Sequence, residues 1–115
     1  MTTIYGIKNC ETMKKACVWL DQNGVRYIFY DYKTMGISAA LPKTWLKQVG
    51  WEVLMNTRGT TWRKLSPLQQ ANLDDAKATA LMIEYPSLIK RPVIEHNDRV
   101  LVGFAPDGYA KFFKQ

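Results

Sequence analysis

The N-terminal third of the chain alternates between a β-type and a helical pattern of hydrophobic positions. Residues 2–7 are rich in β-branched and aromatic side chains, which favours a first strand. Apolar side chains then recur at helical spacing over residues 11–23, and Gly24 ends that pattern because glycine tolerates the left-handed conformation that closes a helix. Val25–Tyr32 is again β-type. A strand, a helix and a strand of these lengths predict two parallel strands joined by a right-handed crossover.

The middle of the chain has a mainly helical pattern. An apolar stripe predicts a helix over residues 38–49 with Ser38 as its cap. The short segment Trp51–Met55 that follows fits neither a strand pattern nor a helical pattern. Residues 56–64 are polar and basic and predict a loop, whereas Ser66-Pro67 indicates the start of another helical stretch. A further helix is expected from residue 74 or 75 to about 85.

The last third returns to a β-type pattern. Arg91–Glu95 predicts a strand opened by a proline, residues 96–98 predict a turn, and Arg99–Phe104 predicts the returning strand of an antiparallel hairpin. A closing helix is expected from about Pro106 to Phe113. The order β-α-β, helices, β-β-α indicates an α/β fold that carries a helical insert.

Composition places the chain among single-domain globular proteins. Its 115 residues suffice for one domain with a real core, and the 47% hydrophobic fraction excludes a disordered chain. No apolar run approaches the ~20 residues of a membrane span, and the N-terminus lacks the charged-then-apolar layout of a signal peptide. We therefore expect a cytoplasmic protein with no membrane partner.

The net charge of +6 comes from lysines and arginines that are spread along the chain rather than gathered in a block. This spread is typical of a solvated surface and does not indicate direct nucleic-acid binding. An anionic small molecule fits the charge equally well. The one histidine, His96, falls in the predicted hairpin turn without a second histidine to share a zinc ion, so we expect no metal site.

Cys10 is the residue with the clearest candidate chemistry. It lies between the first predicted strand and the first predicted helix, beside unpaired helix N–H groups and their partial positive charge. Lys8, Lys14 and Lys15 add positive charge nearby. Such surroundings favour the thiolate, which is the nucleophilic form of cysteine. The alternative is a small buried hydrophobe without reactivity, which is the role that we expect for Cys17.

The spacing of the two cysteines limits how Cys10 can turn over. A helical rise over seven residues separates Cys10 from Cys17 by roughly 10 Å, whereas a disulfide needs Cα atoms within about 7 Å. A thiol from outside must therefore resolve a mixed disulfide on Cys10. Glutathione, another small thiol and a redox partner protein are the candidates.

Four stretches carry a resemblance to a known family: Tyr5–Cys10, Gly50–Leu65, Ile89–Pro92 and Gly103-Phe104. Together they resemble the arsenate reductase (ArsC)-like group of thioredoxin-fold proteins, and most closely its Spx/YffB branch. The resemblance covers essentially the whole chain. It implies a single ArsC-like domain with an α/β thioredoxin-like fold. The implied boundaries are a core of residues 1–36 and 88–115 and a helical insert of residues 37–87.

The resemblance also implies roles for particular residues. Cys10 corresponds to the redox-active cysteine, Arg58 and Arg91 correspond to arginines that line an anion site, and Pro92 corresponds to a cis proline near the cysteine. Each arginine could instead be an ordinary surface residue. Thr12 could bond the Cys10 sulfur or only help to start the helix.

The sequence departs from the patterns of the proteins that it resembles at three positions. Arsenate reductases have a third arginine where this chain has Gly103, and a histidine shortly before the cysteine where it has Gly6. Spx regulators commonly have a second cysteine where this chain has Met13. The first two departures argue against arsenate as the substrate, and the third argues against a disulfide switch.

These observations predict a glutathione-dependent thiol reductase in which Cys10 is the working cysteine. The residues expected at its substrate are Arg58, Arg91, Pro92, Thr12 and Lys8. Glutathione is expected as a co-substrate, with no tightly bound cofactor. The alternatives are a Spx-like redox-responsive regulator that binds RNA polymerase and a true arsenate reductase.

Overall fold

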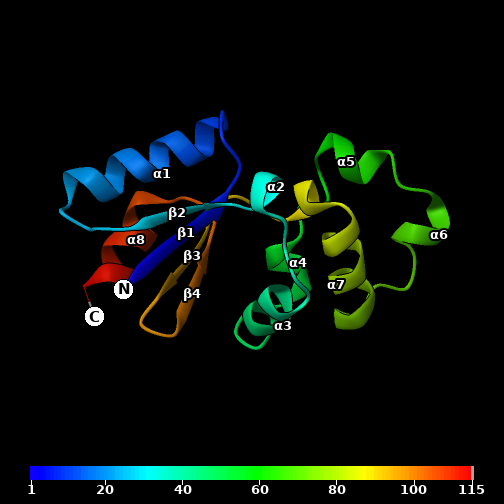
Figure 1. The fold of residues 1–115 in the computed structure, drawn as a ribbon. Coiled ribbons are helices and arrows are strands. Elements are labelled where there is room, and N and C mark those ends of the chain that lie inside the picture. Colours follow the sequence, from blue (N-terminus) through cyan, green and yellow to red (C-terminus); the bar gives the residue numbers. More distant parts are fainter. Residues whose placement is uncertain (115) are drawn as a thin grey trace. The chain divides into compact units, whose positions relative to one another are not determined.

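The computed structural model describes residues 1–114 and divides the chain into two units (Figure 1). The first, here called the sheet unit, comprises residues 1–35 and the residues from Arg91 onward. The second, the helical unit, comprises residues 36–90. No helix within residues 1–114 is both long enough and apolar enough to cross a membrane.

A mixed sheet organises the sheet unit. In the described part of the chain it has four strands in the order β2-β1-β3-β4 (Figure 1). β1 runs parallel to β2, and the other neighbouring pairs are antiparallel. The strands are β1 (Thr2–Gly6), β2 (Ile28–Asp31), β3 (Val93–His96) and β4 (Arg99–Val102). This parallel pair followed by a C-terminal hairpin is the predicted thioredoxin-like α/β fold.

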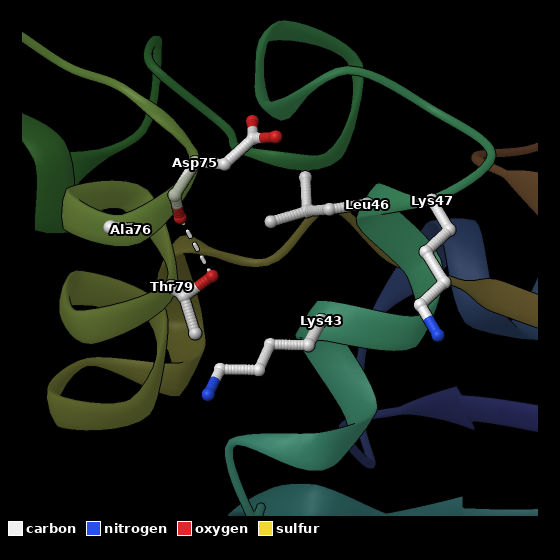
Figure 2. Close-up of a pocket in the computed structure, with 6 residues that line it drawn as sticks. All are labelled: Lys43, Leu46, Lys47, Asp75, Ala76 and Thr79. Atoms are coloured by element: carbon white, nitrogen blue, oxygen red, sulfur yellow. Dashed lines mark hydrogen bonds between the residues drawn. The ribbon is translucent and has the colours of Figure 1, made fainter.

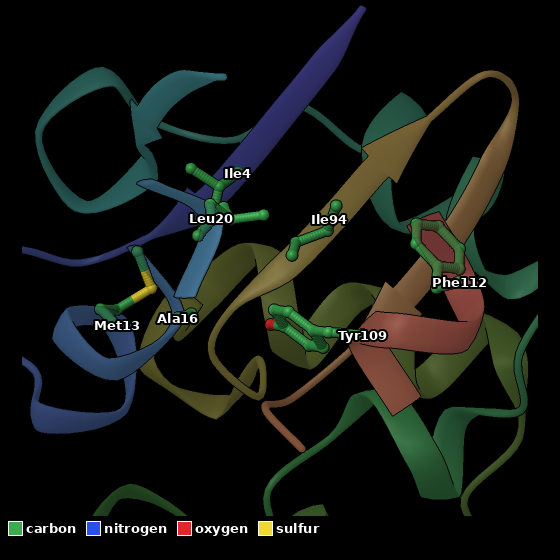
Figure 3. Packing of buried hydrophobic residues seen from close by; sticks show 7 residues of the cluster. All are labelled: Ile4, Met13, Ala16, Leu20, Ile94, Tyr109 and Phe112. Carbon is green, nitrogen blue, oxygen red and sulfur yellow. The ribbon is translucent and has the colours of Figure 1, made fainter. Parts of the chain in front are cut away.

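Two helices, α1 (Glu11–Gln22) and α8 (Pro106–Phe113), cover one face of this sheet. Ile4 of β1 and Ile94 of β3 are register partners, so their side chains point to the same face. Both belong to a buried cluster with residues of the two helices (Figure 3). The helix residues in the cluster are Met13, Ala16, Leu20, Tyr109 and Phe112. Cys10 is partly buried against this cluster, so the turn before α1 is supported by the core.

The helical unit is built from short helices with local caps. Ser66 and Gln69 form a capping box at the start of α6, where the sequence predicts a helical stretch. The Asp74 carboxylate accepts the backbone N–H of Lys77 at 2.8 Å and so caps α7. The elements are α3 (Ala40–Leu46), α4 (Trp51–Leu54), α5 (Thr60–Arg63), α6 (Pro67–Gln70), α7 (Asp75–Glu84) and the 3₁₀ turn η1 (Pro86–Leu88).

The second strand is shorter than predicted at both ends. The backbone N–H of Val25 donates to the carbonyl of Leu20 at 2.9 Å, so this residue closes α1 instead of opening β2. At the other end, the Asp31 carboxylate accepts the backbone N–H of Lys33 at 3.0 Å. This bond turns the chain into the one-turn helix α2 (Tyr32–Met35), which the β-type pattern of the segment concealed.

Two predictions within the helical unit are wrong in detail. The helix expected over residues 38–49 is α3, which is shorter at both ends. Ser38 is not its cap: the N-cap residue is Ala39, whose methyl group cannot accept a hydrogen bond, and Ser38 contributes its backbone carbonyl to the N–H of Leu41. The segment 56–64, expected as a loop, contains α5. The sequence did not reveal this helix, because a single helical turn is too short to show a hydrophobic period.

The C-terminal hairpin is tighter than predicted. His96 belongs to β3 and pairs with Arg99, instead of lying in the turn. Asn97 and Asp98 alone form the turn, with φ values of 49° and 64°. Positive φ at both central residues matches a two-residue type I′ turn, in which Asn and Asp are favoured.

Candidate active site at Cys10

The turn between β1 and α1 presents Cys10 at the N-terminus of a helix. Asn9 has a left-handed φ of 63°, which asparagine tolerates better than most residues. Cys10 follows in an extended conformation as the N-cap residue, and its carbonyl accepts the backbone N–H of Lys14 at 3.0 Å. The Cys10 side chain is therefore placed beside the unpaired N–H groups of the first turn.

The surroundings of Cys10 hold the pKa of its thiol below the ordinary value. Partial burial alone raises that pKa, because it disfavours the charged thiolate. Three donors outweigh burial, namely the backbone N–H of Met13, the guanidinium of Arg91 and the backbone N–H of Thr12. The positive charge of Arg91 acts in the same direction. Thr12 thus contacts the sulfur through its backbone.

Arg91 reaches Cys10 from the segment that precedes β3. The Arg91–Pro92 peptide bond is cis, as the family resemblance implies. Pro92 is buried, and its carbonyl accepts the backbone N–H of Gly103 at 2.8 Å. The carbonyl of Gly103 in turn accepts the hydroxyl of Tyr109. The segment that carries Arg91 is thereby connected to the end of β4 and to α8.

Tyr32 is a residue of this site that the sequence did not reveal. It is fully buried at the start of α2, and its hydroxyl accepts a hydrogen bond from Arg91. Burial raises the pKa of Tyr32 and Arg91 opposes that rise, so the hydroxyl stays neutral at physiological pH. Arg91 therefore bonds both the Cys10 sulfur and a buried phenol. A tyrosine at the end of an apolar strand pattern carries no signal that separates this role from ordinary packing.

Gly6 makes room for Met13 beneath the Cys10 turn. A Cβ added at Gly6 would lie 2.2 Å from the Met13 Sδ and 2.5 Å from its Cε. Met13 is 4% exposed and belongs to the core cluster. In the family resemblance, these are the positions of the arsenate reductase histidine and of the second Spx cysteine. The two departures are thus one packing pair, in which the glycine accommodates the methionine.

A groove of about 270 Å³ opens beside Cys10. The turn before α1 and the first two turns of that helix form one side, and Phe29 of β2 lies on the other. Lys8 is exposed at its rim. Cys17 also faces the groove, is half-buried and packs against the core, as predicted. Both cysteines are free thiols.

Cys17 has surroundings different from those of Cys10. The hydroxyl of Tyr27 donates a hydrogen bond to the Cys17 sulfur, and this bond together with burial raises the pKa of Tyr27 to about 12. A hydroxyl donor is a neutral group, whereas Cys10 receives donors from a guanidinium and a helix N-terminus. The structure therefore assigns the activated environment to Cys10.

Arg58 belongs to the helical unit, where its side chain is exposed. Its backbone N–H donates to the Asn56 Oδ1 at 3.0 Å, which fixes the backbone just before α5. The role of Arg58 at an anion site stays a prediction.

A second hollow, also of about 270 Å³, lies within the helical unit between α3 and α7 (Figure 2). Lys43, Lys47 and Asp75 bring charges of both signs to it. The hydroxyl of Thr79 donates to the Asp75 carbonyl at 2.7 Å and is thus used within α7. Its lining contains no thiol or imidazole among the described residues, and we assign no chemistry to it.

His96 has a packing environment at the end of β3. Its Nδ1 lies 2.6 Å from the Thr2 Oγ1, and its ring contacts the rings of Phe112 and Phe113. Burial lowers the pKa of His96. Within residues 1–114, no group of three or more His, Cys, Asp and Glu side chains is arranged to hold a metal ion.

Comparisons with known proteins agree with the fold. The model of the ArsC family matches residues 5–112. The solved structure of the YFFB (PA3664) protein is 51% identical with a TM-score of 0.93, over 96% of this chain and 97% of that one. The structure of an arsenate reductase (ArsC) related protein from Brucella melitensis is 49% identical with a TM-score of 0.77, over 99% and 95%. The global transcriptional regulator Spx of Staphylococcus aureus is 26% identical over 97% of this chain and 86% of its own length. This chain therefore belongs to the ArsC family.

Proposed function

We propose that this protein is a glutathione-dependent thiol reductase with Cys10 as its single working cysteine. The observation that supports the proposal best is the set of donors around the Cys10 sulfur: two backbone N–H groups of α1 and the guanidinium of Arg91. These donors favour the thiolate, and attack of a thiolate on a disulfide sulfur starts thiol–disulfide exchange.

The proposed reaction takes place in two exchanges. The Cys10 thiolate attacks the glutathionyl sulfur of a mixed disulfide, a Cys10–glutathione disulfide forms, and the other thiolate leaves and takes a proton from water. A second glutathione thiolate then attacks the glutathionyl sulfur on Cys10. Oxidised glutathione leaves, and the Cys10 thiolate is restored. The net reaction converts the mixed disulfide and one free glutathione thiol into the substrate's free thiol and oxidised glutathione, so the disulfide bond passes to glutathione and no bound cofactor is required.

Glutathione carries two carboxylates and one ammonium group, so positive side chains suit it. Arg91 is half-buried next to Cys10, and a guanidinium pairs with both oxygens of a carboxylate at once. We propose Arg91 as the principal carboxylate ligand, with Lys8 and Arg58 as further positive groups. Pro92 and the backbone of Thr12 would border the sulfur.

Turnover of a glutathione mixed disulfide tests this function. The substrate is the mixed disulfide of glutathione and 2-mercaptoethanol, and NADPH consumption by added glutathione reductase reports the oxidised glutathione formed. The Cys10→Ser variant should lose more than about 99% of the wild-type rate, because a serine hydroxyl without an activating base is a far weaker nucleophile than a thiolate. Cys17→Ala is the matched control and should keep Cys10-dependent turnover. Equal rates in wild type and Cys10→Ser would refute the proposal.

The second candidate is a redox-responsive regulator that binds RNA polymerase. The similarity to Spx over almost the whole chain favours it. This chain has Met13 at the position of the second Spx cysteine, so it cannot form the disulfide of a Cys-x-x-Cys redox switch. The immobilised wild-type protein and the Cys10→Ser variant should therefore both fail to retain RNA polymerase from a bacterial lysate. Retention of polymerase together with absent turnover would replace the reductase by the regulator.

Arsenate reduction is the third candidate and the least supported. An oxyanion needs several donors around it, and Gly103 stands where arsenate reductases have their third arginine. We expect arsenate-dependent NADPH oxidation, measured with glutathione and glutaredoxin, to stay near background. Robust turnover that disappears in Cys10→Ser would make this protein an arsenate reductase instead.

A further inference from the structure

The groove beside Cys10 has an apolar interior that the exchange reaction does not itself require. Phe29 is the register partner of Ile4, which points into the core under α1, so Phe29 projects from the same face of the sheet. β2 is an edge strand, and the Phe29 side chain is 37% exposed. Met13 of α1 lies across the groove from it. An exposed aromatic ring beside a reactive thiol offers a contact surface to an apolar group.

The rim of the groove next to Cys10 is positively charged. Lys8 and Lys14 line it. Lys14 also lies 3.6 Å from the carboxylate of Glu11, and both side chains are largely exposed, which makes this a weak ion pair. Two cations and one carboxylate leave an excess of positive charge at the rim. A ligand with an anionic end would find that charge within reach of the apolar interior.

The position of the groove relative to the sulfur determines which part of a substrate can occupy it. Cys10 lines the groove, so any group bonded near its sulfur is close to this space. The two substituents of a disulfide diverge, because the dihedral angle about the S–S bond is near 90°. If the glutathionyl half is held by Arg91, the other half is directed away from it. A volume of about 270 Å³ accommodates a ring-sized group.

We propose that this groove binds the departing half of the mixed disulfide, and that it selects small thiols with an aromatic body and a carboxylate. This assignment rests on the proposed reductase function. In the first exchange the S–S bond of the substrate breaks as the Cys10–glutathione bond forms, and the aromatic thiolate leaves from the groove and is protonated by water. Phe29 and Met13 contact the ring, and Lys8 and Lys14 attract the carboxylate.

Three probe substrates separate the two parts of this proposal. They are the glutathione mixed disulfides of 2-mercaptoethanol, of benzyl mercaptan and of 4-(mercaptomethyl)benzoate. All three leaving groups are alkyl thiols, so differences in thiol acidity contribute little. We expect kcat/KM to rise about tenfold from the first probe to the second, through apolar contact, and about threefold more to the third. Uncatalysed exchange with glutathione serves as the reference for each probe.

Two pairs of variants locate the selectivity. Phe29→Ala should reduce the preference for the benzyl probe over the 2-mercaptoethanol probe to less than about twofold. Ile28→Ala is the matched control, because Ile28 is exposed on the opposite face of the same strand and should leave that preference intact. Lys8→Gln should remove most of the carboxylate preference, whereas Lys15→Gln, which does not line the groove, should retain it.

A binding measurement without turnover distinguishes failure of the groove from failure of the reductase. 4-Ethylbenzoate has the ring and the carboxylate but no sulfur. Titrated into the wild-type protein, it should shift the backbone amide resonances of Asn9 and of residue 29. The shift of the Asn9 resonance should disappear in Phe29→Ala but persist in Ile28→Ala. Shifts without glutathione-dependent turnover would support the groove and reject the reductase. Absence of shifts, or a benzyl preference that survives in Phe29→Ala, would overturn the groove assignment.

Discussion

The sheet unit and the helical unit differ in how far along the chain their defining contacts reach. In the sheet unit, Cys10, Tyr32 and Arg91 come from the turn before α1, the start of α2 and the segment before β3, and the pairing of the strands brings them together. In the helical unit, the capping box at Ser66 and the cap at Asp74 join residues three positions apart. Longer connections, among them the bridge between Met55 and Ile89, join distant parts of the unit.

Because of this difference, the pKa of Cys10 depends on contacts between distant segments, whereas the helix caps of the helical unit depend on local contacts. The lowered pKa of Cys10 requires that α1 and the segment before β3 hold their places, because α1 contributes two backbone donors and that segment carries Arg91. A local cap in the helical unit joins residues of its own helix. We therefore expect that only variants in the sheet unit can change the pH profile of Cys10 alkylation.

The largest expected effect comes from Arg91. Arg91→Gln removes a charged donor from the Cys10 sulfur, so the thiol pKa should rise toward its ordinary value and less thiolate should be present at neutral pH. A hydrogen bond to a charged group contributes about 2 kcal/mol, so kcat/KM for a glutathione disulfide should fall about thirtyfold. The pH profile of iodoacetamide alkylation at Cys10 should shift upward in parallel.

Arg58→Gln is the matched change in the helical unit. Since its predicted role is to bind an anion and not to activate the thiol, it should raise KM by a few-fold and leave the alkylation profile unchanged. An upward shift of that profile as large as the one in Arg91→Gln would show that the thiol depends on both units, and the comparison would fail.

The next effect concerns Gly6, the glycine beneath the Cys10 turn. Gly6→Ala places a methyl group where the Met13 side chain packs, and overpacking of this kind costs between about 1 and 3 kcal/mol. Urea unfolding should show that loss of stability. Gly50→Ala meets only the mobile end of Glu52, at 2.8 Å, and should change stability by less than about 1 kcal/mol. Equal losses in the two variants would contradict the packing argument.

The sequence predicted what local patterns encode. The strand–helix–strand start, the hairpin and a helix that begins at residue 74 or 75 follow from spacing and from the chemistry of single residues. The sequence did not reveal that β2 ends at Asp31 and that α2 follows it. A carboxylate that caps a one-turn helix does not interrupt a β-type pattern of side chains. Residues 56–64 did not reveal α5, because a single helical turn is too short to show a hydrophobic period.

The residues of the candidate site could be predicted from the sequence only where their contacts are local. Cys10 could be found from the sequence, because a strand end and a helix start are adjacent to it. Arg91 was assigned through family resemblance, since no local feature joins it to Cys10. Tyr32 was missed because its partner lies far along the chain, and burial of a tyrosine is expected wherever a core forms. The contact of Arg91 with both groups is a product of the tertiary fold.

A smaller effect is expected from Tyr32→Phe. This change deletes the hydroxyl that accepts a hydrogen bond from Arg91 while it keeps the buried ring, so the guanidinium should be held less firmly beside Cys10. One neutral acceptor contributes about 1 kcal/mol, which corresponds to about a fivefold decrease in kcat/KM. The alkylation profile of Cys10 should move toward higher pH, a change that loss of packing alone would not produce.

Tyr85→Phe provides the control for that variant. The hydroxyl of Tyr85 accepts a hydrogen bond from the Gln69 amide at 3.4 Å, within the helical unit. Its removal should leave the alkylation of Cys10 unchanged. If Tyr32→Phe behaves in the same way as Tyr85→Phe, then Tyr32 is a packing residue and Arg91 is positioned by the backbone alone.

The smallest expected effect is the loss of a local cap. Asp74→Ala removes the carboxylate that accepts the Lys77 N–H at the start of α7, and loss of such a cap typically costs about 1 kcal/mol. Asp74→Ser keeps an acceptor at the same position and should recover most of the stability. Because α7 and its cap lie wholly within the helical unit, both variants should show the wild-type rate and pH profile of Cys10 alkylation under conditions where the protein is folded. A shift in that profile in Asp74→Ala that Asp74→Ser reverses would mean that the first turn of α7 influences the thiol, and the thiol's environment would then include the helical unit.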